Sequence, residues 1–219
     1  MIRAVSYITY PTLRFDASKH MTKTDNTIDR GRPRNADIDV AVMKSTLKLL
    51  GRVGFRRLTL DAVAESAGVG KMAIYRRWPN KASVVMDAFL TLIGPESEFP
   101  SATRAIIRLK LQMRLQAKLF AGDYGKLIKA LLGESQFDEE LAEAFRNRWL
   151  IPRRKMTLDV LNVAVKQGDL RADLDLDTVI DILYGPFYYR LQLGIGTLDS
   201  KFSDRVWSAA IAGFRIAGS

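Results

Sequence analysis

Residues 71 to 78 hold the side chains of this sequence that are best suited to bind a phosphate-rich partner. Lys71, Arg76 and Arg77 are cations, and Tyr75 adds a phenol to the same short segment. Ammonium, guanidinium and hydroxyl groups donate hydrogen bonds to phosphate oxygens, and an arginine can also pair with the edge of a guanine in the major groove of DNA. The chemistry that this segment could perform is therefore recognition of a nucleic acid.

The period of an α-helix separates this segment into two faces. At about 100° per residue, Ile74 and Trp78 fall on one side, where we expect them to be buried. The small Ala73 lies on the opposite side and would let the helix approach its partner closely. The side chains that we expect to contact DNA from this helix are Lys71, Met72, Ala73, Tyr75, Arg76 and Arg77.

The residues before this helix could position it through a helix-turn-helix. The Thr59 hydroxyl can cap a helix over residues 60 to 67, whose apolar residues recur at three- and four-residue spacing. Gly68 follows the last of them, where a left-handed conformation would end the helix. Two short helices joined by a glycine turn are typical of DNA-binding heads.

These residues resemble the DNA-binding head of the TetR family of transcriptional regulators. The resemblance rests on motifs at fixed spacing, namely Gly54-Phe55, Leu58-Thr59-Leu60, Ala67-Gly68-Val69-Gly70 and Ile74-Tyr75-Arg-Arg-Trp78-Pro-Asn-Lys81. Two positions depart from the family pattern, since Arg77 stands where a histidine is frequent and Trp78 where a phenylalanine is usual. An arginine should keep a phosphate contact, and a tryptophan remains a large apolar side chain.

The resemblance implies a homodimeric repressor that binds a palindromic operator in double-stranded DNA. The family positions that contact phosphates correspond here to Thr59, Tyr75, Arg77 and Lys81. Arg32 and Arg34 precede the first helix on a short basic arm. Arginines on such an arm can enter a minor groove, and a solvated basic linker is an equally good interpretation of them.

The distribution of charge agrees with a DNA partner for the first part of the chain. The protein has 219 residues, a formal net charge of +10 and a pI of 9.9. Residues 1 to 93 hold 16 Lys and Arg against 8 Asp and Glu, whereas residues 94 to 219 hold 18 against 16. The excess positive charge is thus concentrated around the basic helix, where it would attract phosphates.

Several classes of catalytic site lack the residues that they need. The sequence has no cysteine, and its single histidine, His20, lies in the N-terminal segment. Ser-His and Cys-His pairs and most zinc sites are therefore excluded, and no phosphate-binding loop or dinucleotide fingerprint occurs. We expect no enzyme, no cofactor and no metal, and a helical enzyme with an unrecognised site is the weakest alternative. The lack of cysteine and of a long uncharged apolar run predicts a cytoplasmic protein without a membrane span.

The sequence predicts an all-α protein with three parts. Residues 1 to 30 are expected to form a flexible leader, residues 31 to 93 a DNA-binding head with a three-helix helix-turn-helix, and residues 94 to 219 a larger helical domain for effector binding and dimerisation. The boundary is placed at residues 94 to 100, where two prolines and a glycine interrupt the helical pattern. Helices are expected near residues 37–53, 60–67, 71–78, 81–93, 101–121, 123–133, 137–149, 152–167, 175–195 and 201–217.

The last two helices carry the strongest signal for a partner. Residues 169 to 199 resemble the C-terminal domain of one TetR subgroup, and by that resemblance the two helices pair with their copies in a four-helix dimer interface. The residues assigned to this interface are Leu183, Phe187, Leu191, Phe202, Val206, Ala210 and Gly213. The alternative is that they only close the core of a single chain. Pro186 is expected to kink its helix or to leave a carbonyl without a donor.

The resemblance also implies a cavity for an unknown small-molecule effector in the helical domain. Amphipathic and soft side chains on apolar segments could orient a ligand there. The candidates are Met113, Gln116, Phe120, Trp149, Tyr184 and Tyr188. The alternative is an architectural DNA-binding dimer without an effector. A filled helical domain would favour that alternative, and an enclosed cavity of a few hundred Å³ would favour a ligand-responsive repressor.

Overall fold

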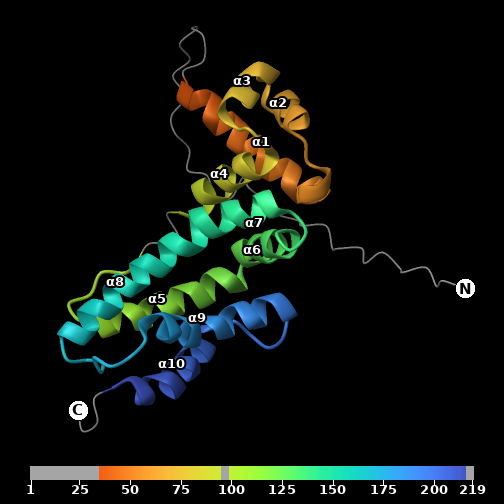
Figure 1. Ribbon diagram of the computed structural model, residues 1–219. Helices are drawn as coiled ribbons and strands as arrows, with labels where there is room; N and C mark the ends of the chain where they lie inside the picture. Colours follow the sequence, from red (N-terminus) through yellow and green to blue (C-terminus); the bar gives the residue numbers. More distant parts are fainter. Residues whose placement is uncertain (1–34, 95–98, 216–219) are drawn as a thin grey trace, which may run out of the picture. The chain divides into compact units, whose positions relative to one another are not determined.

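The computed structural model describes residues 35–94 and 99–215, and within these ranges all regular elements are helices, as predicted (Figure 1). Arg32, Arg34 and the segment assigned as a leader lie outside the described residues. The chain separates into two compact units, one ending at Lys81 and the other beginning at Ala82. The division falls at the start of the fourth helix, whereas the sequence analysis placed a boundary after that helix.

The first unit is a head built on three helices, α1 (Asn35–Arg57), α2 (Leu60–Ala67) and α3 (Lys71–Arg77). The short α2 packs against both α1 and α3. Val42, Val63 and Ile74, one from each helix, have no exposed surface. This shared core holds the two short helices in fixed positions on the longer one, because moving either would expose apolar side chains to water.

The turn between α2 and α3 has the expected chemistry. The Thr59 hydroxyl accepts a hydrogen bond from the Ala62 N–H at 3.2 Å, and so caps α2. Gly68 adopts the left-handed conformation (φ 65°), which lets its N–H reach the carbonyls of Ala64 and Glu65. At the end of α1, Gly54 (φ 76°) interrupts the helical dihedral angles close to the expected helix end.

The fourth helix, α4 (Lys81–Ile93), follows α3 after a short connection through Pro79 and Asn80. Its apolar residues are buried along nearly its whole length, and Val84, Val85 and Phe89 have no exposed surface. Only the first residue of α4 belongs to the first unit. The helix is therefore the covalent continuation of the head into the second unit.

The second unit contains the remaining helices around a central α5. The elements are α5 (Ala105–Ala121), α6 (Asp123–Glu134), α7 (Glu139–Phe145), α8 (Ile151–Lys166), α9 (Leu176–Leu193) and α10 (Ser200–Phe214). α5 packs against α6, α8, α9 and α10, and Figure 1 shows it between α8 on one side and α9 with α10 on the other. None of the helices in the described ranges is long and apolar enough to cross a bilayer.

A π-helical segment, Arg146–Leu150, joins α7 to α8 without a break in the helical backbone. The Ile151 N–H donates to the Arg146 carbonyl, which is the five-residue spacing of a π-turn. Pro152 follows, and in a regular α-helix its ring would crowd the carbonyl four residues earlier. The wider turn accommodates this proline, so one continuous helical rod forms where the sequence analysis expected two helices.

The helices α9 and α10 pack against each other through aromatic side chains. Phe187 of α9 and Phe202 of α10 meet edge to face, with 5.3 Å between their ring centroids. Pro186 lies inside α9, but the helix continues to its end at Leu193. The proline removes the N–H that the Ile182 carbonyl would otherwise accept. Ile182 is an exposed residue, so water can replace that donor.

Gly125, near the start of α6, allows the chain to turn tightly between α5 and α6. A Cβ at this position would lie 1.9 Å from the carbonyl oxygen of Phe120, and this backbone atom cannot rotate away. We therefore expect Gly125→Ala to lower the free energy of unfolding by about 1–3 kcal/mol, measured by urea denaturation of the full chain.

Gly133→Ala is the matched control on the same helix. Nothing lies within 4 Å of its added Cβ, so the alanine should stabilise α6 by roughly 0.5–1 kcal/mol. Equal effects of the two substitutions would contradict the close approach at Gly125.

Candidate nucleic-acid interface and ligand cavity

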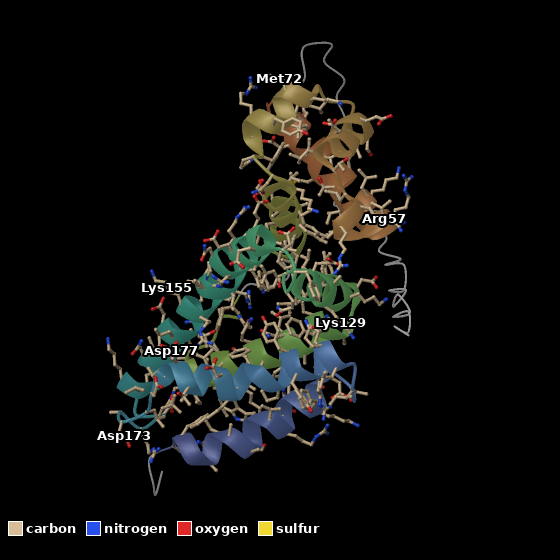
Figure 2. The ribbon with its side chains drawn as sticks, turned by 45° about the vertical axis from the view of Figure 1, so that its right-hand side comes forward. Arg57, Met72, Lys129, Lys155, Asp173 and Asp177 are labelled. Atoms are coloured by element: carbon tan, nitrogen blue, oxygen red, sulfur yellow. The ribbon has the colours of Figure 1, made fainter. Side chains whose placement is uncertain are left out.

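The orientation of α3 is the one that its periodicity predicted. Ile74 and Trp78 are 0% and 5% exposed, whereas Met72 is 84% exposed and Tyr75 is 51% exposed. The Met72 side chain projects away from the helices of the head in Figure 2. The outward face of α3 therefore carries the side chains that the sequence analysis assigned to DNA, with Arg76 exposed and Ala73 partly exposed.

Asp61 of α2 connects two of these side chains. Its carboxylate accepts a hydrogen bond from the Lys71 ammonium at 2.6 Å and another from the Tyr75 hydroxyl at 3.0 Å. The bond from Lys71, followed by that from Tyr75, lowers the pKa of the Asp61 carboxyl. The same carboxylate raises the pKa of both Lys71 and Tyr75, so both keep their protons as donors. Sequence analysis missed Asp61, because only the packing of α2 on α3 brings it beside them.

The other predicted phosphate contacts differ in their surroundings. Thr59 is exposed while it caps α2. The Lys81 ammonium donates to the Phe55 carbonyl at 3.4 Å and lies 4.4 Å from the centroid of the Phe55 ring. Arg77 is more enclosed, since its guanidinium lies 3.1 Å from the Asp39 carboxylate of α1 and only 19% of its side chain is exposed. A phosphate would have to compete with this ion pair.

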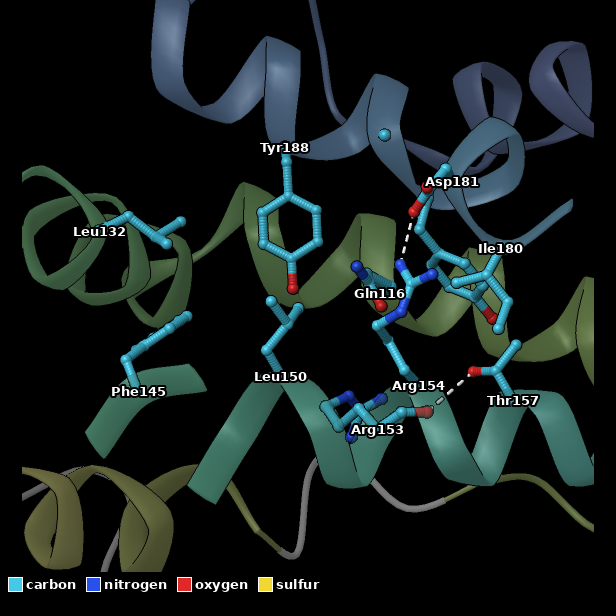
Figure 3. Close-up of a pocket in the computed structure, with 12 residues that line it drawn as sticks. Gln116, Leu132, Phe145, Leu150, Arg153, Arg154, Thr157, Ile180, Asp181 and Tyr188 are labelled. Atoms are coloured by element: carbon cyan, nitrogen blue, oxygen red, sulfur yellow. Dashed lines mark hydrogen bonds and ion pairs between the residues drawn. The ribbon is translucent and has the colours of Figure 1, made fainter. Parts of the chain in front are cut away.

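The second unit contains a cavity of about 270 Å³ bordered by α5, α8 and α9. Figure 3 shows Tyr188 extending from α9 across this space toward α8, with its hydroxyl directed into it. The remaining lining side chains come from five helices and the π-helical segment; they are Gln116, Leu132, Phe145, Leu150, Arg153, Arg154, Thr157, Ile180, Asp181 and Tyr184, together with Gly185. Most of the lining surface is apolar, and α5, α8 and α9 each contribute polar side chains to it.

Two neighbouring arginines of α8 have different roles at this cavity. Arg154 forms ion pairs with Asp177 at 2.9 Å and Asp181 at 2.5 Å, both on α9. The Arg153 guanidinium instead lies over the Trp149 ring, with its Cζ 4.7 Å from the ring centroid. Burial lowers the pKa of Arg153, because a cation loses hydration when it leaves water.

The hydroxyl of Tyr184 is buried without a hydrogen bond of normal geometry. Burial is the main influence on this hydroxyl and raises the pKa of Tyr184 to about 12. The nearby Thr157 hydroxyl opposes this rise in pKa, but it donates its own hydrogen bond to the Arg153 carbonyl at 3.0 Å. Burial also raises the pKa of Tyr188. Both phenols therefore remain neutral donors at physiological pH.

Three of the six predicted cavity residues line the cavity. Gln116, Tyr184 and Tyr188 do so, whereas Met113 and Phe120 are buried in the surrounding core and Trp149 supports Arg153 from outside the lining. The aliphatic and charged lining residues were missed. The available signal was the pair of adjacent arginines directly after Pro152, but sequence spacing alone did not predict that either side chain would line a cavity.

The predicted interface residues divide into two groups. Four of them are buried in the protomer, with exposed fractions of 1% for Leu183, 0% for Phe187, 7% for Leu191 and 5% for Phe202. They have little surface left to contact a second copy, so the intrachain alternative describes them better. On α10, Val206 and Ala210 are partly exposed and Gly213 is exposed.

Both units match family models of transcriptional regulators. Residues 42–87 match the model described as "Bacterial regulatory proteins, tetR family", and residues 108–210 match "Tetracyclin repressor-like, C-terminal domain". The HTH-type transcriptional regulator YdeS of Bacillus subtilis is 36% identical over 181 residues, which cover 82% of this chain and 91% of YdeS. The DNA-binding transcriptional repressor TetR of Mycobacteroides abscessus is 30% identical over 184 residues, covering 82% of this chain and 92% of that one.

Solved structures agree with these matches. The TetR family transcription regulator SCO0332 is 26% identical, superposes with a TM-score of 0.68, and is matched over 81% of this chain and 98% of its own. The structure of the transcriptional regulator FadR from Bacillus subtilis in complex with stearoyl-CoA is 19% identical, with a TM-score of 0.63. The match covers 80% of this chain and 98% of that one, and it shows a common fold. The exposed basic face of α3, the capped helix-turn-helix that carries it and these matches together assign the chain to the TetR family of DNA-binding transcriptional regulators, which are not enzymes.

Proposed function

We propose that this regulator is a cytoplasmic repressor that binds a palindromic operator as a homodimer and leaves it when a small molecule occupies the cavity. The orientation of α3 carries the proposal, since it exposes Met72, Tyr75 and Arg76 while it buries Ile74 and Trp78. A recognition helix of this length spans only ~12 Å, so one head reads few base pairs. Two heads related by a dyad read a palindrome. The repressor function of the Mycobacteroides abscessus relative supports repression here.

The cavity supports an effector over the architectural alternative. Its volume of about 270 Å³ lies close to the lower end of the range for small-molecule sites, roughly 300–1,000 Å³. Stearoyl-CoA belongs to the FadR complex, and that structure shares only its fold with this chain. We therefore propose a small-molecule effector for this cavity without carrying over the ligand of FadR.

We propose that ligand binding in the cavity acts on the head through α4. Trp149, beside the cavity, packs edge-on against Phe89 of α4 with 5.1 Å between ring centroids. Arg148 pairs with Asp87 of α4 and donates to the Ser83 carbonyl at 3.3 Å. A ligand that favours another position of the π-helical segment would shift α4, but only to the extent that it binds the two conformations with different affinity.

We place the dimer interface on the outward faces of α9 and α10. Ile182, Tyr189 and Leu193 are 44%, 59% and 58% exposed, and their spacing puts them on one side of α9. The exposed residues of α10 include the small Ser208, Ala209, Ala212 and Gly213. Small residues let helices of two copies approach closely, and the apolar stripe of α9 supplies surface to bury.

Substitutions on α3 should separate phosphate contacts from base contacts. Tyr75→Ala is expected to weaken binding to the chain's own upstream DNA roughly tenfold, irrespective of sequence, because a phosphate hydrogen bond is lost. Arg76→Ala should instead change the preferred sequence, at a cost of about 1–3 kcal/mol for the best site. Gel shifts across a salt series and with randomised half-sites measure both effects.

Arg57→Ala is the control for these substitutions, because Arg57 projects from a different side of the head from Met72 in Figure 2. It should change affinity little. Unchanged DNA binding in both α3 variants would refute the docking of α3 on DNA.

Asp61→Asn should tighten nonspecific DNA binding. The change removes the carboxylate charge that holds Lys71, and the freed ammonium can neutralise a phosphate. We expect the slope of log affinity against log salt to become steeper by about 0.9 for each head. Glu65→Gln removes the same charge from an exposed position on α2 and is the matched control. If both variants steepen the slope equally, the effect belongs to net charge and not to the Lys71 bond.

Tyr189→Glu combined with Leu193→Glu should convert the dimer to a monomer. Each substitution would bury a carboxylate against an apolar helix, and the pair should weaken association by more than about 2 kcal/mol. Light scattering after size exclusion gives the mass, and circular dichroism checks that the helices remain. Val163→Glu, at a similarly exposed apolar position on α8, is the control and should stay dimeric. A double variant that remains dimeric would place the interface elsewhere.

A further inference from the structure

The charged side chains around the cavity balance one another. Arg153, Arg154 and Asp181 belong to its lining, and Arg154 forms ion pairs with both Asp181 and Asp177. Arg153 is already engaged, since its guanidinium lies over the Trp149 ring. Two cations and two carboxylates leave no surplus charge for an ionic ligand, and an ion without a partner is costly to bury. The cavity therefore favours a neutral ligand.

Two phenol groups of α9 supply hydrogen-bond donors to this cavity. Tyr184 and Tyr188 are four residues apart, so they lie on the same face of the helix in successive turns. Both line the cavity, and Figure 3 shows the Tyr188 hydroxyl directed into it. A single ligand in the cavity can therefore meet both phenols.

The Tyr184 hydroxyl is buried and has no hydrogen bond of normal geometry with any described residue. The nearby Thr157 hydroxyl donates its own proton to the Arg153 carbonyl at 3.0 Å. Burial raises the pKa of Tyr184 to about 12, so the phenol keeps its proton at physiological pH. A buried donor of this kind is unfavourable until an acceptor reaches it, and a ligand in the cavity can supply that acceptor.

The proton of the Tyr188 hydroxyl is also available to a ligand. Burial raises the pKa of Tyr188, and the nearby Trp149 N–H opposes that rise. An indole N–H is a donor only, so it can approach a lone pair of the phenol oxygen but cannot accept the phenol proton. The Tyr188 O–H therefore acts as a second donor toward the cavity.

A pair of hydroxyl donors without surplus charge selects a ligand group that only accepts hydrogen bonds. A carbonyl oxygen has this property, because it carries two lone pairs and no proton. It can accept from both tyrosines without adding a donor that would need a partner of its own. Leu132, Phe145 and Leu150 supply apolar walls for the rest of the ligand.

We propose that the cavity binds a small neutral carbonyl compound, a ketone or an ester on an apolar body, whose carbonyl oxygen accepts hydrogen bonds from Tyr184 and Tyr188. The proposal rests on the proposed function in so far as this cavity is the effector site. It also gives the buried Tyr184 hydroxyl a role, since a group that is unfavourable in the free protein becomes satisfied in the complex.

The first test compares ligands that differ at the polar group, in ligand-detected NMR titrations of the full chain without DNA. The probes are acetophenone with ethylbenzene and benzoate, and cyclohexanone with cyclohexane and cyclohexanecarboxylate. At least one ketone should bind roughly tenfold or more tightly than both its hydrocarbon and its acid. The hydrocarbon lacks the acceptor, and the acid brings a charge that has no partner. If neither ketone shows this preference, the proposal is overturned.

Tyr184→Phe separates a ligand-binding role of this hydroxyl from a structural one. The variant should bind the ketone roughly tenfold more weakly, because one donor is lost. The melting temperature of the free chain should stay the same or rise, because a buried donor without a partner disappears. A lower melting temperature with an unchanged preference for the ketone over its hydrocarbon would contradict the proposal.

Tyr188→Phe should also weaken ketone binding severalfold, and in the double variant the ketone and its hydrocarbon should bind about equally. Tyr189→Phe is the matched control, because Tyr189 is 59% exposed and lies outside the cavity lining. It should leave the affinity for the ketone unchanged. A double variant that keeps the full preference for the ketone would show that other groups bind the carbonyl, and would overturn the assignment of the two phenols.

Gel shifts with the best ketone separate this proposal from the proposed function. A ketone that binds through the two phenols but does not release DNA would contradict ligand-controlled repression alone. DNA binding by a chain that shows no preference for ketones would contradict the carbonyl site alone.

Discussion

The burial of Ile74 and Trp78 fixes the rotation of α3 about its own axis, and the DNA-binding surface follows from that rotation. Removing a side chain of isoleucine size from water contributes roughly 1.5–3 kcal/mol. The exposed Lys71–Asp61 ion pair contributes little by comparison, because water screens it. Apolar packing therefore sets the orientation, and the polar contacts refine it: once Ile74 faces inward, helical geometry turns Met72 and Arg76 outward.

Asp61 shows how polar contacts act on a surface that packing has already oriented. Its carboxylate holds Lys71 and Tyr75 together on the free protein, which reduces the number of positions that these long side chains sample. The same charge repels phosphate. The head thus combines a fixed donor arrangement with a moderated positive potential, a combination that favours recognition of one site over indiscriminate attraction to DNA.

In the second unit, Pro152 has a comparable organising role. Trp149 lies within the π-turn that precedes this proline, and the Arg153 guanidinium lies over its ring beside the cavity. Trp149 also packs on Phe89 of α4, so the wall of the cavity and the helix that continues into the head share one aromatic cluster. A cluster of close-packed rings transmits displacement instead of absorbing it, because interiors have few voids into which a ring can move. Single π-helical turns inside α-helices are frequent at functional sites.

The sequence by itself determined the all-helical class, the helix-turn-helix and the outward face of α3, because caps, glycine turns and helical period are local properties that neighbouring residues encode. It also identified Gln116, Tyr184 and Tyr188 as candidates for the cavity. Only the tertiary structure decided that Asp61 meets Lys71, that Arg153 turns inward while Arg154 pairs across to α9, and that Phe187 and Phe202 close the core of one chain. Periodicity shows that a helix has an apolar face, but it does not say whether that face meets its own chain or a second copy. That choice depends on how helices distant in the sequence pack, because the same buried area stabilises either contact.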